Sequence, residues 1–406
     1  MLYFLIFFFN LSILNWENTG ELERALTVVD LIIGPNGYLY AAANIDTTSL
    51  DSGWVFYSSD FYHWQRGNDI PGEVKRIYCF LKTAGETLFI GTKAKYEPSY
   101  SYHYNQVDSG RLYFSTDGIN WYFRSLLRGR KVGSSITALL EDTLGRIIAG
   151  HNYAGMSGYP PCYSIDRGRN WLQGPTTTYN AYHYSLLKAR DGSLYCGTWG
   201  VGGLVLKSTD HGETWFATDT LFDAGHTPTI IEAPDGTLFA GTYPKTNPRE
   251  PIGRIFKSTN GGNEWIEIGY GYFHSTTGIR SLCLTHDGAL YAGTAPNAEV
   301  FVSFNNGDSW LSTGRLPGAN VVYKLLEVIK NDTFFLYAAT GPNGDIFRAV
   351  LSTVDINQKE PKLLLNKRGP FIIYNSCGQK IKNLKIFKKG IFFLKFKNQI
   401  HKIVIK

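Results

Sequence analysis

The sequence predicts an all-β fold made of seven similar units, and two recurring patterns carry this prediction. The first is a turn of the form Ser-x-Asp/Asn-x-Gly-x-Ser/Thr-Trp, whose clearest copy is STDHGETW at 208–215. The second is a run such as GTLFAGTY at 236–243, in which apolar residues alternate after a tight turn, as in a hairpin strand. The Trp residues recur about every 44 to 57 residues, a period typical of ring-shaped repeat proteins.

The first pattern has the chemistry of a tight turn between two strands. Its Asp or Asn side chain accepts hydrogen bonds from backbone N–H groups, its Gly adopts a positive φ, and its Trp covers the turn. Asn can replace Asp because the amide oxygen is an equivalent acceptor. We expect these structural roles at Asp60, Asp117, Asp166, Asp210, Asn260 and Asn305, together with Trp64, Trp121, Trp171, Trp215, Trp265 and Trp310.

Each unit is predicted to form four strands, but the seventh unit lacks the sequence of its fourth strand. Ala349 stands there at the position of the turn Ser, and no Trp follows it. At the other end of the chain, Trp16 and the following ENTG resemble Trp310 and its LSTG. We therefore expect the N-terminal strand to complete the seventh unit, which closes the ring and covers its edge strands. The prediction is a seven-bladed β-propeller of four-stranded blades, with a small C-terminal β module.

The turn pattern resembles the Asp box of the bacterial neuraminidase repeat family, and the resemblance covers roughly residues 16–351. Sialidases, xyloglucan hydrolases, photosystem assembly factors and sorting receptors are similar to one another in having this box. The resemblance therefore implies a propeller fold and leaves the ligand open. We expect the propeller at 15–354, a linker at 355–361 and the β module at 362–406.

The two ends of the chain differ in composition from the body. Residues 1–14 form an apolar run of the length of a signal segment, although a basic start and a cleavage pattern are missing. Residues 361–406 carry 11 Lys, one Arg and no acidic residue, so the body holds 28 basic against 34 acidic residues. No apolar run reaches the length of a membrane-spanning helix.

The basic C-terminal segment resembles the sorting domain of the bacterial type IX secretion system, without the proline-containing opening usual in that family. The resemblance implies secretion by that machinery and an extracellular or outer-membrane surface location in a bacterium. The alternative is a basic appendage of two or three strands. The matching residues are Tyr374, Asn375, Gly378, Gln379, Lys380, Gly390, Phe393, Lys395, Lys402 and Ile403.

The two faces of such a ring differ in their connections. We call the four strands of each blade A to D in chain order. The A–B and C–D turns lie on one face, which we call the Asp-box face, and the B–C and D–A connections lie on the other, the loop face. The loop-face connections are long and rich in aromatic residues, so we expect the ligand there. The candidate ligand-binding residues are Tyr96, Tyr102, His103, Tyr104, His151, Tyr182, His183, Tyr184, Trp199, His226, Tyr243, Tyr272, His274, Arg76 and Arg280.

Two functions from different classes fit these residues. One is a secreted or surface-attached, monomeric propeller that binds a glycan or a protein ligand without catalysis, since Tyr and Trp rings stack on sugar faces. The other is a glycoside hydrolase of the Asp-box type, which needs converging carboxylates and, if sialidase-like, clamping arginines. No spacing singles out catalytic residues for that reaction. The acidic and basic residues near this face are Arg24, Arg76, Arg280, Glu73, Asp108, Asp219, Asp223 and Glu250.

Other chemistries are not indicated. No metal or cofactor is expected, because the histidines lack ligand spacing and no phosphate-binding glycine loop is present. Nucleic acid is not expected as a partner, because the body is acidic and the basic residues of the tail alternate with strand residues. The five cysteines are odd in number, and those within strand patterns, such as Cys196 and Cys283, are expected to be free buried thiols.

Overall fold

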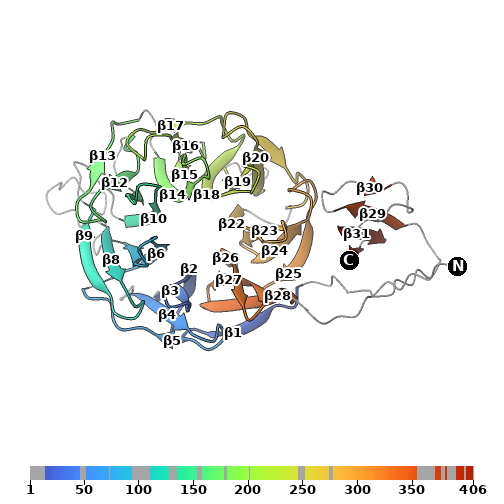
Figure 1. The fold of residues 1–406 in the computed structure, drawn as a ribbon, viewed down its shortest axis with the longest axis horizontal. Helices are drawn as coiled ribbons and strands as arrows, with labels where there is room; N and C mark the ends of the chain where they lie inside the picture. The colour runs from blue at the N-terminus through green and yellow to red at the C-terminus, as the bar shows by residue number, and fades with distance from the viewer. Residues whose placement is uncertain are drawn as a thin grey trace.

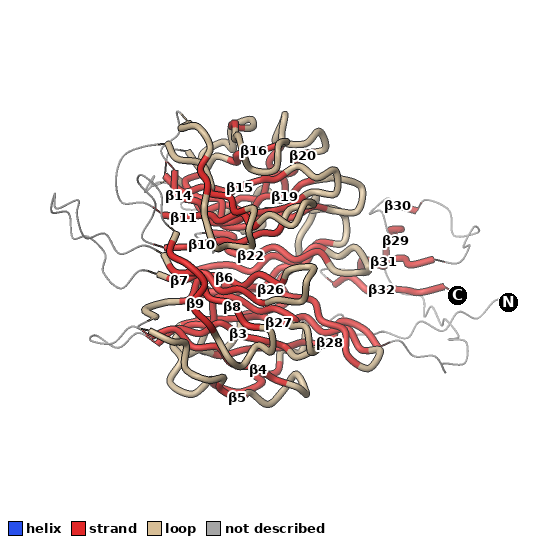
Figure 2. Tube along the Cα trace, turned by 60° about the vertical axis from the view of Figure 1, so that its left-hand side comes forward, coloured by secondary structure: helices blue, strands red, loops and turns tan. Residues whose placement is uncertain are grey.

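The computed structural model describes residues 14–45, 52–72, 74–93, 110–127, 135–152, 158–177, 181–200, 202–245, 252–273, 278–353, 371–375, 380–381, 390–396 and 399–405. Within these ranges the chain forms strands, turns and loops and no α-helix, as Figure 2 shows. A helix able to span a membrane is accordingly not found in the described ranges.

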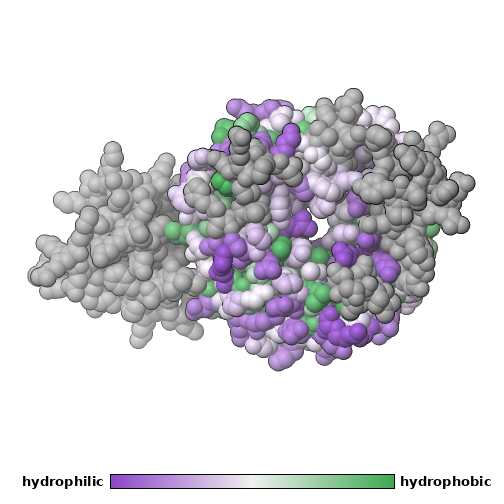
Figure 3. Space-filling model, turned by 180° about the vertical axis from the view of Figure 1, so that it is seen from behind, coloured by the Kyte–Doolittle hydropathy of each residue, from purple (hydrophilic) through white to green (hydrophobic). Residues whose placement is uncertain are grey.

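Seven four-stranded antiparallel blades follow one another around a ring (Figure 1), which confirms the predicted propeller. The ring is open at its centre when viewed from behind (Figure 3). The first four blades are β2–β5 (Thr27–Ile33, Leu39–Ile45, Ser52–Ser58, Gln65–Arg66), β6–β9 (Ile77–Lys82, Leu88–Thr92, Arg111–Ser115, Tyr122–Leu126), β10–β13 (Ser135–Glu141, Ile147–Asn152, Cys162–Ser164, Leu172–Gln173) and β14–β17 (Ala181–Lys188, Leu194–Gly200, Val205–Ser208, Phe216–Ala217).

The remaining three blades are built in the same order, with the first strand of each nearest the centre of the ring in Figure 1. Blades five to seven are β18–β21 (Ala224–Glu232, Leu238–Pro244, Arg254–Ser258, Ile266–Ile268), β22–β25 (Gly278–Leu284, Leu290–Ala295, Glu299–Ser303, Leu311–Arg315) and β26–β28 (Val321–Lys330, Thr333–Gly341, Asp345–Thr353) with β1 (Glu17–Glu21).

A separate four-stranded sheet is formed by the C-terminal part of the chain. Its strand order is β30-β29-β31-β32, with Phe371–Asn375 as β29, Lys380–Ile381 as β30, Gly390–Phe396 as β31 and Gln399–Ile405 as β32.

The N-terminal strand closes the ring, as predicted. β1 pairs with β28, with Glu17 opposite Arg348, and so becomes the outer strand of the seventh blade. The Thr19 hydroxyl donates to the Ile346 carbonyl oxygen at 2.9 Å, and the Trp16 indole Nε1 donates to the Thr313 hydroxyl of blade six at 3.3 Å. The last blade is therefore held by both ends of the propeller sequence, and β28 is not left as an open edge.

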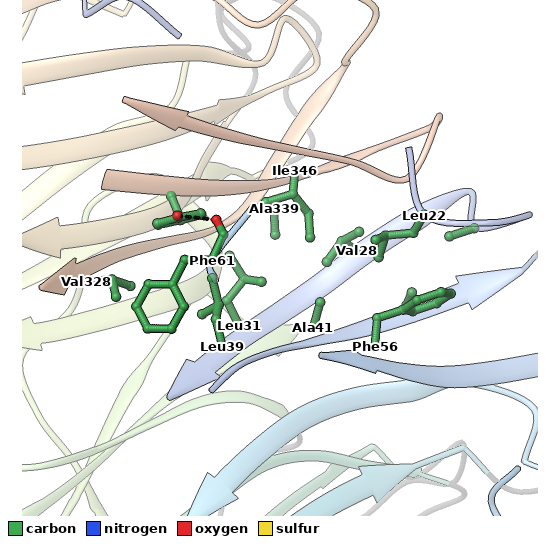
Figure 4. Close-up of a cluster of buried hydrophobic side chains, with 13 residues drawn as sticks. Leu22, Val28, Leu31, Leu39, Ala41, Phe56, Phe61, Val328, Ala339 and Ile346 are labelled. Carbon is green, nitrogen blue, oxygen red and sulfur yellow. Dashed lines mark hydrogen bonds between the residues drawn. The ribbon is translucent and has the colours of Figure 1, made fainter. Parts of the chain in front are cut away.

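A separate apolar cluster lies between each pair of neighbouring blades. Strand residues alternate between the two faces of a blade, so each blade contributes one set of side chains to the preceding interface and another to the next. The interface of blades seven and one shows this arrangement (Figure 4): Leu39 and Ala41 of blade one pack against Ala339 and Ile346 of blade seven. The fold is thus a closed series of similar interfaces.

The Asp boxes adopt the predicted turn. In all six boxes the Asp or Asn Oδ1 atom accepts backbone N–H groups two to four residues ahead, at 2.8–3.0 Å. Asn260 and Asn305 make the same bond as the Asp residues, from the N–H groups of Glu264 and Ser309. The box Ser, for which the pattern alone suggests no role, also donates its hydroxyl to this oxygen in every box.

The boxes also join neighbouring blades, which the turn pattern alone did not indicate. The hydroxyls of Tyr40 and Tyr195 donate to box carbonyl oxygens of the following blade, at 2.9 and 3.1 Å. Tyr337 of blade seven makes the corresponding bond to Phe61 of blade one at 2.6 Å (Figure 4). Gly118 illustrates why a box needs glycine, because its φ is +73° and a Cβ would lie 2.2 Å from the Tyr40 ring.

Candidate binding site at the loop-face end of the inner strands

All seven inner strands contain a β-bulge close to their first residues, at the loop face of the ring. Their pairing with the second strand shifts by one or two residues at this point. A bulge turns a side chain away from the regular alternation and is common next to functional sites. The residues that the shifts leave out of the pairing are Val29, Tyr78, Thr137, Tyr184, Gly225, Thr227, Pro228, Arg280 and Tyr323.

Aromatic rings form a continuous row across blades four and five beside these bulges. The Tyr182 and Trp199 rings lie 4.8 Å apart, and the Trp199 and His226 rings 4.9 Å apart. The row continues to Tyr243, whose ring is 5.7 Å from that of His226. Trp199 and His226 also form a backbone bridge, and this single bridge joins the two blades into one eight-stranded sheet. Their rings are consequently held together by the backbone.

Arg280, the bulge residue of blade six, lies among these rings. Its guanidinium carbon is 5.8 Å from the centre of the Tyr184 ring and 5.5 Å from that of Tyr323, which is within the range of a cation–π contact. In the part of the chain that the structure describes, Arg280 makes no ion pair with a carboxylate. We call the surrounding half-buried rings the aromatic arc; they are Tyr182, Tyr184, Trp199, His226, Tyr243 and Tyr323.

The charge of this site at neutral pH comes from Arg280. Burial and, to a smaller extent, the charge of Arg280 lower the pKa of His226 to about 4, so the imidazole is neutral. Burial raises the pKa of Tyr184 and of Tyr243, while Arg280 opposes both rises. The aromatic arc is therefore uncharged, and one guanidinium supplies a positive charge with N–H donors available to a ligand.

Two predicted site residues lie beneath the surface. His151 and His183 are 2% and 1% exposed, and their rings are in edge-on contact at 4.7 Å between blades three and four. The His183 Nδ1 atom accepts the His151 backbone N–H at 3.3 Å, and the Pro160 carbonyl oxygen lies 3.2 Å from His151 Nε2. Their rings pack inside an interface because they sit at strand ends where neighbouring blades touch. We therefore leave them out of the site.

The other predicted residues are dispersed or fall outside the described ranges. Arg76 precedes β6 in blade two, and Tyr272 is 42% exposed on the connection between blades five and six, where its backbone N–H donates to Gly269. The ring contacts that define the aromatic arc are made by other residues. The predictions that lie outside the described residues are Tyr96, Tyr102, His103, Tyr104 and His274.

Of the residues considered for hydrolysis, Arg280 lies at the arc, but the carboxylates are not seen to converge on it within the described ranges. Asp223 lies 3.6 Å from Arg254, and the Asp219 side chain accepts the N–H of the next residue. Arg24 lies over the Trp54 ring at 5.9 Å. Glu73, Asp108 and Glu250 fall outside the described residues. A group of three metal-ligating side chains is likewise not found among the described residues.

Sequence reasoning missed Tyr78 and Tyr323, which occupy the bulge positions of blades two and seven. Tyr323 contacts Arg280, and Tyr78 adds to the rise in the pKa of Tyr184. Both residues belong to inner strands rather than to loops, so a search for aromatic residues in the connections passes over them. Aligning the seven inner strands with one another would have placed them in the same row as Arg280.

Comparisons with known proteins identify the fold but not a family. No family model matches the sequence, and no curated protein matches it. Among solved structures, virginiamycin B lyase from Staphylococcus aureus is similar with a TM-score of 0.61 at 10% identity, over 83% of this chain and 99% of that chain. YCF48 bound to D1 peptide is similar with a TM-score of 0.59 at 15% identity, over 86% and 99%.

A third similar structure is an extracellular domain. The extracellular domain of the hybrid two component system BT4673 from B. thetaiotaomicron has a TM-score of 0.58 at 13% identity. The match covers 96% of this chain and 46% of that one. At these identities the likeness concerns the fold alone. The chain is a β-propeller similar in fold to virginiamycin B lyase, to YCF48 and to the extracellular domain of a two component system.

Proposed function

We propose that the protein is a non-catalytic binding propeller that takes an acidic glycan or an acidic peptide on the aromatic arc. The observation that carries this proposal is the position of Arg280 among half-buried rings, without a carboxylate partner in the described residues. A guanidinium that binds a ligand carboxylate gains charge-assisted hydrogen bonds, and it does so more strongly where neighbouring rings exclude water. The arc supplies flat apolar faces for the rest of the ligand.

The form of the arc favours an extended ligand over a small one. Its rings run from blade four to blade seven, and each is half-buried, so the site is a row of shallow contacts rather than a closed cavity. Glycan chains and peptides suit such a row, since successive units can meet successive rings. The structure of YCF48 with D1 peptide supports a peptide as one of the two classes, as an example of a similar propeller that holds one.

The test is a binding screen with matched variants. The whole chain is applied to arrays of acidic and neutral glycans and of acidic and neutral peptides, and every ligand found is then titrated. Arg280→Gln should lower the affinity for the acidic ligand at least about tenfold. Phe216→Ala is the control, since Phe216 is a 48% exposed aromatic residue on the outer strand of blade four. A ligand bound equally by wild type and Arg280→Gln would contradict the proposal.

The same samples address the glycoside hydrolase alternative. Fluorogenic glycosides, including a sialoside, are incubated with the wild-type chain, and we expect no turnover above that of the buffer. Turnover that disappears when a candidate carboxylate such as Asp223 is changed to Asn would replace the binding proposal by the hydrolase. The screen therefore separates the two classes even while the ligand is unidentified.

We further propose that the protein acts outside the cell or on its surface and that residues 362–406 direct its export. Support comes from the resemblance of that segment to type IX sorting domains and from the extracellular domain among the similar structures. A reporter carrying a signal peptide and residues 355–406 is expressed in a bacterium with this secretion system. Export is the expected result, and a reporter that stays periplasmic while a complete sorting domain exports it would contradict the proposal.

A further inference from the structure

A pocket of about 380 Å³ lies on the opposite face of the ring, between blades two and three. Its walls are the A–B turns of these two blades, the Asp box of each blade and the outer strand of blade two. Arg124 comes from β9, whereas Arg167 and Arg169 come from the blade-three box. Phe114 lines the same pocket, with the 2% exposed Phe89 packed beneath it, so the lining combines three arginine residues with an aromatic side chain.

The local structure holds Arg124 toward this pocket. Its Nε donates to the Arg167 backbone carbonyl oxygen at 2.9 Å, and its guanidinium carbon lies 4.9 Å from the centre of the Phe114 ring. One of the five N–H donors of Arg124 is thereby used, and the other four have no hydrogen-bond partner in the described part of the chain. A fixed fork of free donors is the arrangement that matches an anion with several oxygens.

The positive charge of the pocket is offset only in part by the protein: the Asp166 carboxylate attracts Arg124 electrostatically, while Arg169 and Arg167 repel it. None of the three arginines forms an ion pair with a carboxylate within the described ranges. Glu141 lines the pocket, but its Oε2 atom already accepts the Ala84 backbone N–H at 2.6 Å. The lining groups thus carry three positive charges and one negative charge, which is a net excess of two.

The corresponding positions between blades three and four show what is usual in this ring. There Arg146 pairs with Glu213 at 2.7 Å, and His211 lies 3.0 Å from Asp142. Between blades six and seven, His286 pairs with Glu327 at 2.6 Å. Basic side chains on the Asp-box face therefore meet carboxylates at two other interfaces. The arginines between blades two and three lack such a partner, so the repeated architecture does not explain their clustering.

We propose that this pocket binds a phosphate monoester with an aromatic or other apolar body. A phosphate monoester carries close to two negative charges at neutral pH and three acceptor oxygens, which matches the charge excess and the free N–H donors. The apolar body is accommodated by the aromatic lining, where Phe114 is already stacked against a guanidinium. This site is independent of the aromatic arc, since it lies on the other face of the ring.

The experiment is a titration of the whole chain with phenyl phosphate, inorganic phosphate and benzoate. Phenyl phosphate should bind best, inorganic phosphate should be weaker because it lacks the body, and benzoate should be at least tenfold weaker because it carries one charge. Arg124→Gln and Arg169→Gln should each weaken phenyl phosphate binding at least tenfold. Arg315→Gln, at an exposed position on the outer strand of blade six, should leave it unchanged.

Two further measurements keep the result unambiguous. Melting temperatures show whether Arg124→Gln, which loses the hydrogen bond to Arg167, still folds. Because Arg169 is exposed, Arg169→Gln should not affect folding, and its phenyl phosphate affinity is a second test of the pocket. Arg280→Gln should leave phenyl phosphate binding unchanged. The proposal is overturned if phenyl phosphate shows no saturable binding at millimolar concentration, if folded Arg169→Gln binds it like wild type, or if Arg280→Gln abolishes the binding.

Discussion

On the Asp-box face six turns repeat the same hydrogen bonds at 2.8–3.0 Å, whereas on the loop face the bulges of the seven inner strands present different side chains. The bulge itself is a repeated backbone feature, so the loop face is as regular in its main chain as the other. The difference lies in which residue occupies the bulge: valine in blade one, which packs against an apolar cluster, arginine in blade six and tyrosine in blade seven. We expect repetition on one face to stabilise the ring, and variation on the other to provide the proposed site.

The largest effect is expected from opening the ring. Removing residues 1–21 deletes β1, exposes the edge of β28 and removes the bonds of Trp16 and Thr19 to blades six and seven. We expect aggregation and the loss of a single cooperative unfolding transition, because an unpaired edge strand recruits other chains. Calorimetry and light scattering measure both. Removing residues 361–406 is the matched deletion, and it should leave the transition of the ring in place.

The next effect concerns the buried histidines between blades three and four. Burial lowers the pKa of His151 to about 4 and that of His183 well below its usual value, so the folded state disfavours their cations. The unfolded chain takes up these protons below about pH 6.5, and the folded chain does not until about pH 4. Stability should therefore be complete above pH 6.5 and fall as the pH drops toward 4.

For His151 alone this loss amounts to about 3 kcal/mol across that window. Urea unfolding at several pH values measures it, and His151→Gln should flatten the slope of stability against pH. Although Asp117 and Asp166 also have a lowered pKa, of about 2, their contribution is lost mainly below pH 4, outside this window. A stability that does not change between pH 6.5 and 4 would contradict the buried placement of the pair.

A smaller effect is expected from a single Asp box. Asp210 accepts the backbone N–H of Thr214 at 2.9 Å and the hydroxyl of Ser208 at 2.8 Å. Asp210→Ala leaves these donors unpaired, which should cost about 1–3 kcal/mol. Denaturant unfolding gives the value, and Asp210→Asn serves as control because Asn260 and Asn305 show that the amide performs the same role. An alanine variant as stable as the asparagine variant would count against the structural role of the box.

The smallest change in stability is expected at the loop face. Arg280 makes contacts with two rings and no ion pair in the described residues, so Arg280→Gln should alter the free energy of unfolding by less than about 0.5 kcal/mol. The same unfolding experiments measure it. A loss comparable with that of Asp210→Ala would mean that Arg280 stabilises the ring, and the distinction between the two faces would fail at this position.

The ring was predictable because its signals are local and repeated. A box specifies its own turn within eight residues, and the likeness of Trp16 to Trp310 was enough to infer closure, since any repeated strand must pair somewhere. The bonds between blades were not predictable in the same way. Tyr337 and Phe61 are 276 residues apart in sequence, and only the closed ring brings the hydroxyl to the carbonyl.

The site was predictable only in part. Trp199, His226 and Arg280 were proposed for the site from their place at strand ends, and the structure brings them near one another. Whether such a residue turns outward or packs between blades depends on the bulge, which shifts the alternation of side chains and leaves no mark in the sequence pattern. His183 and Tyr184 are neighbours in one strand, yet the first is buried against blade three and the second faces Arg280.

The central claim, that binding belongs to the aromatic arc and stability to the boxes, is tested most directly by one paired measurement. Ligand affinity and melting temperature are determined for wild type, Arg280→Gln and Asp210→Ala, with the acidic glycan or peptide found in the screen. We predict that Arg280→Gln loses affinity at an unchanged melting temperature, and that Asp210→Ala keeps its affinity while melting earlier. Lost affinity in Asp210→Ala at an unchanged melting temperature, with Arg280→Gln binding normally, would contradict the account.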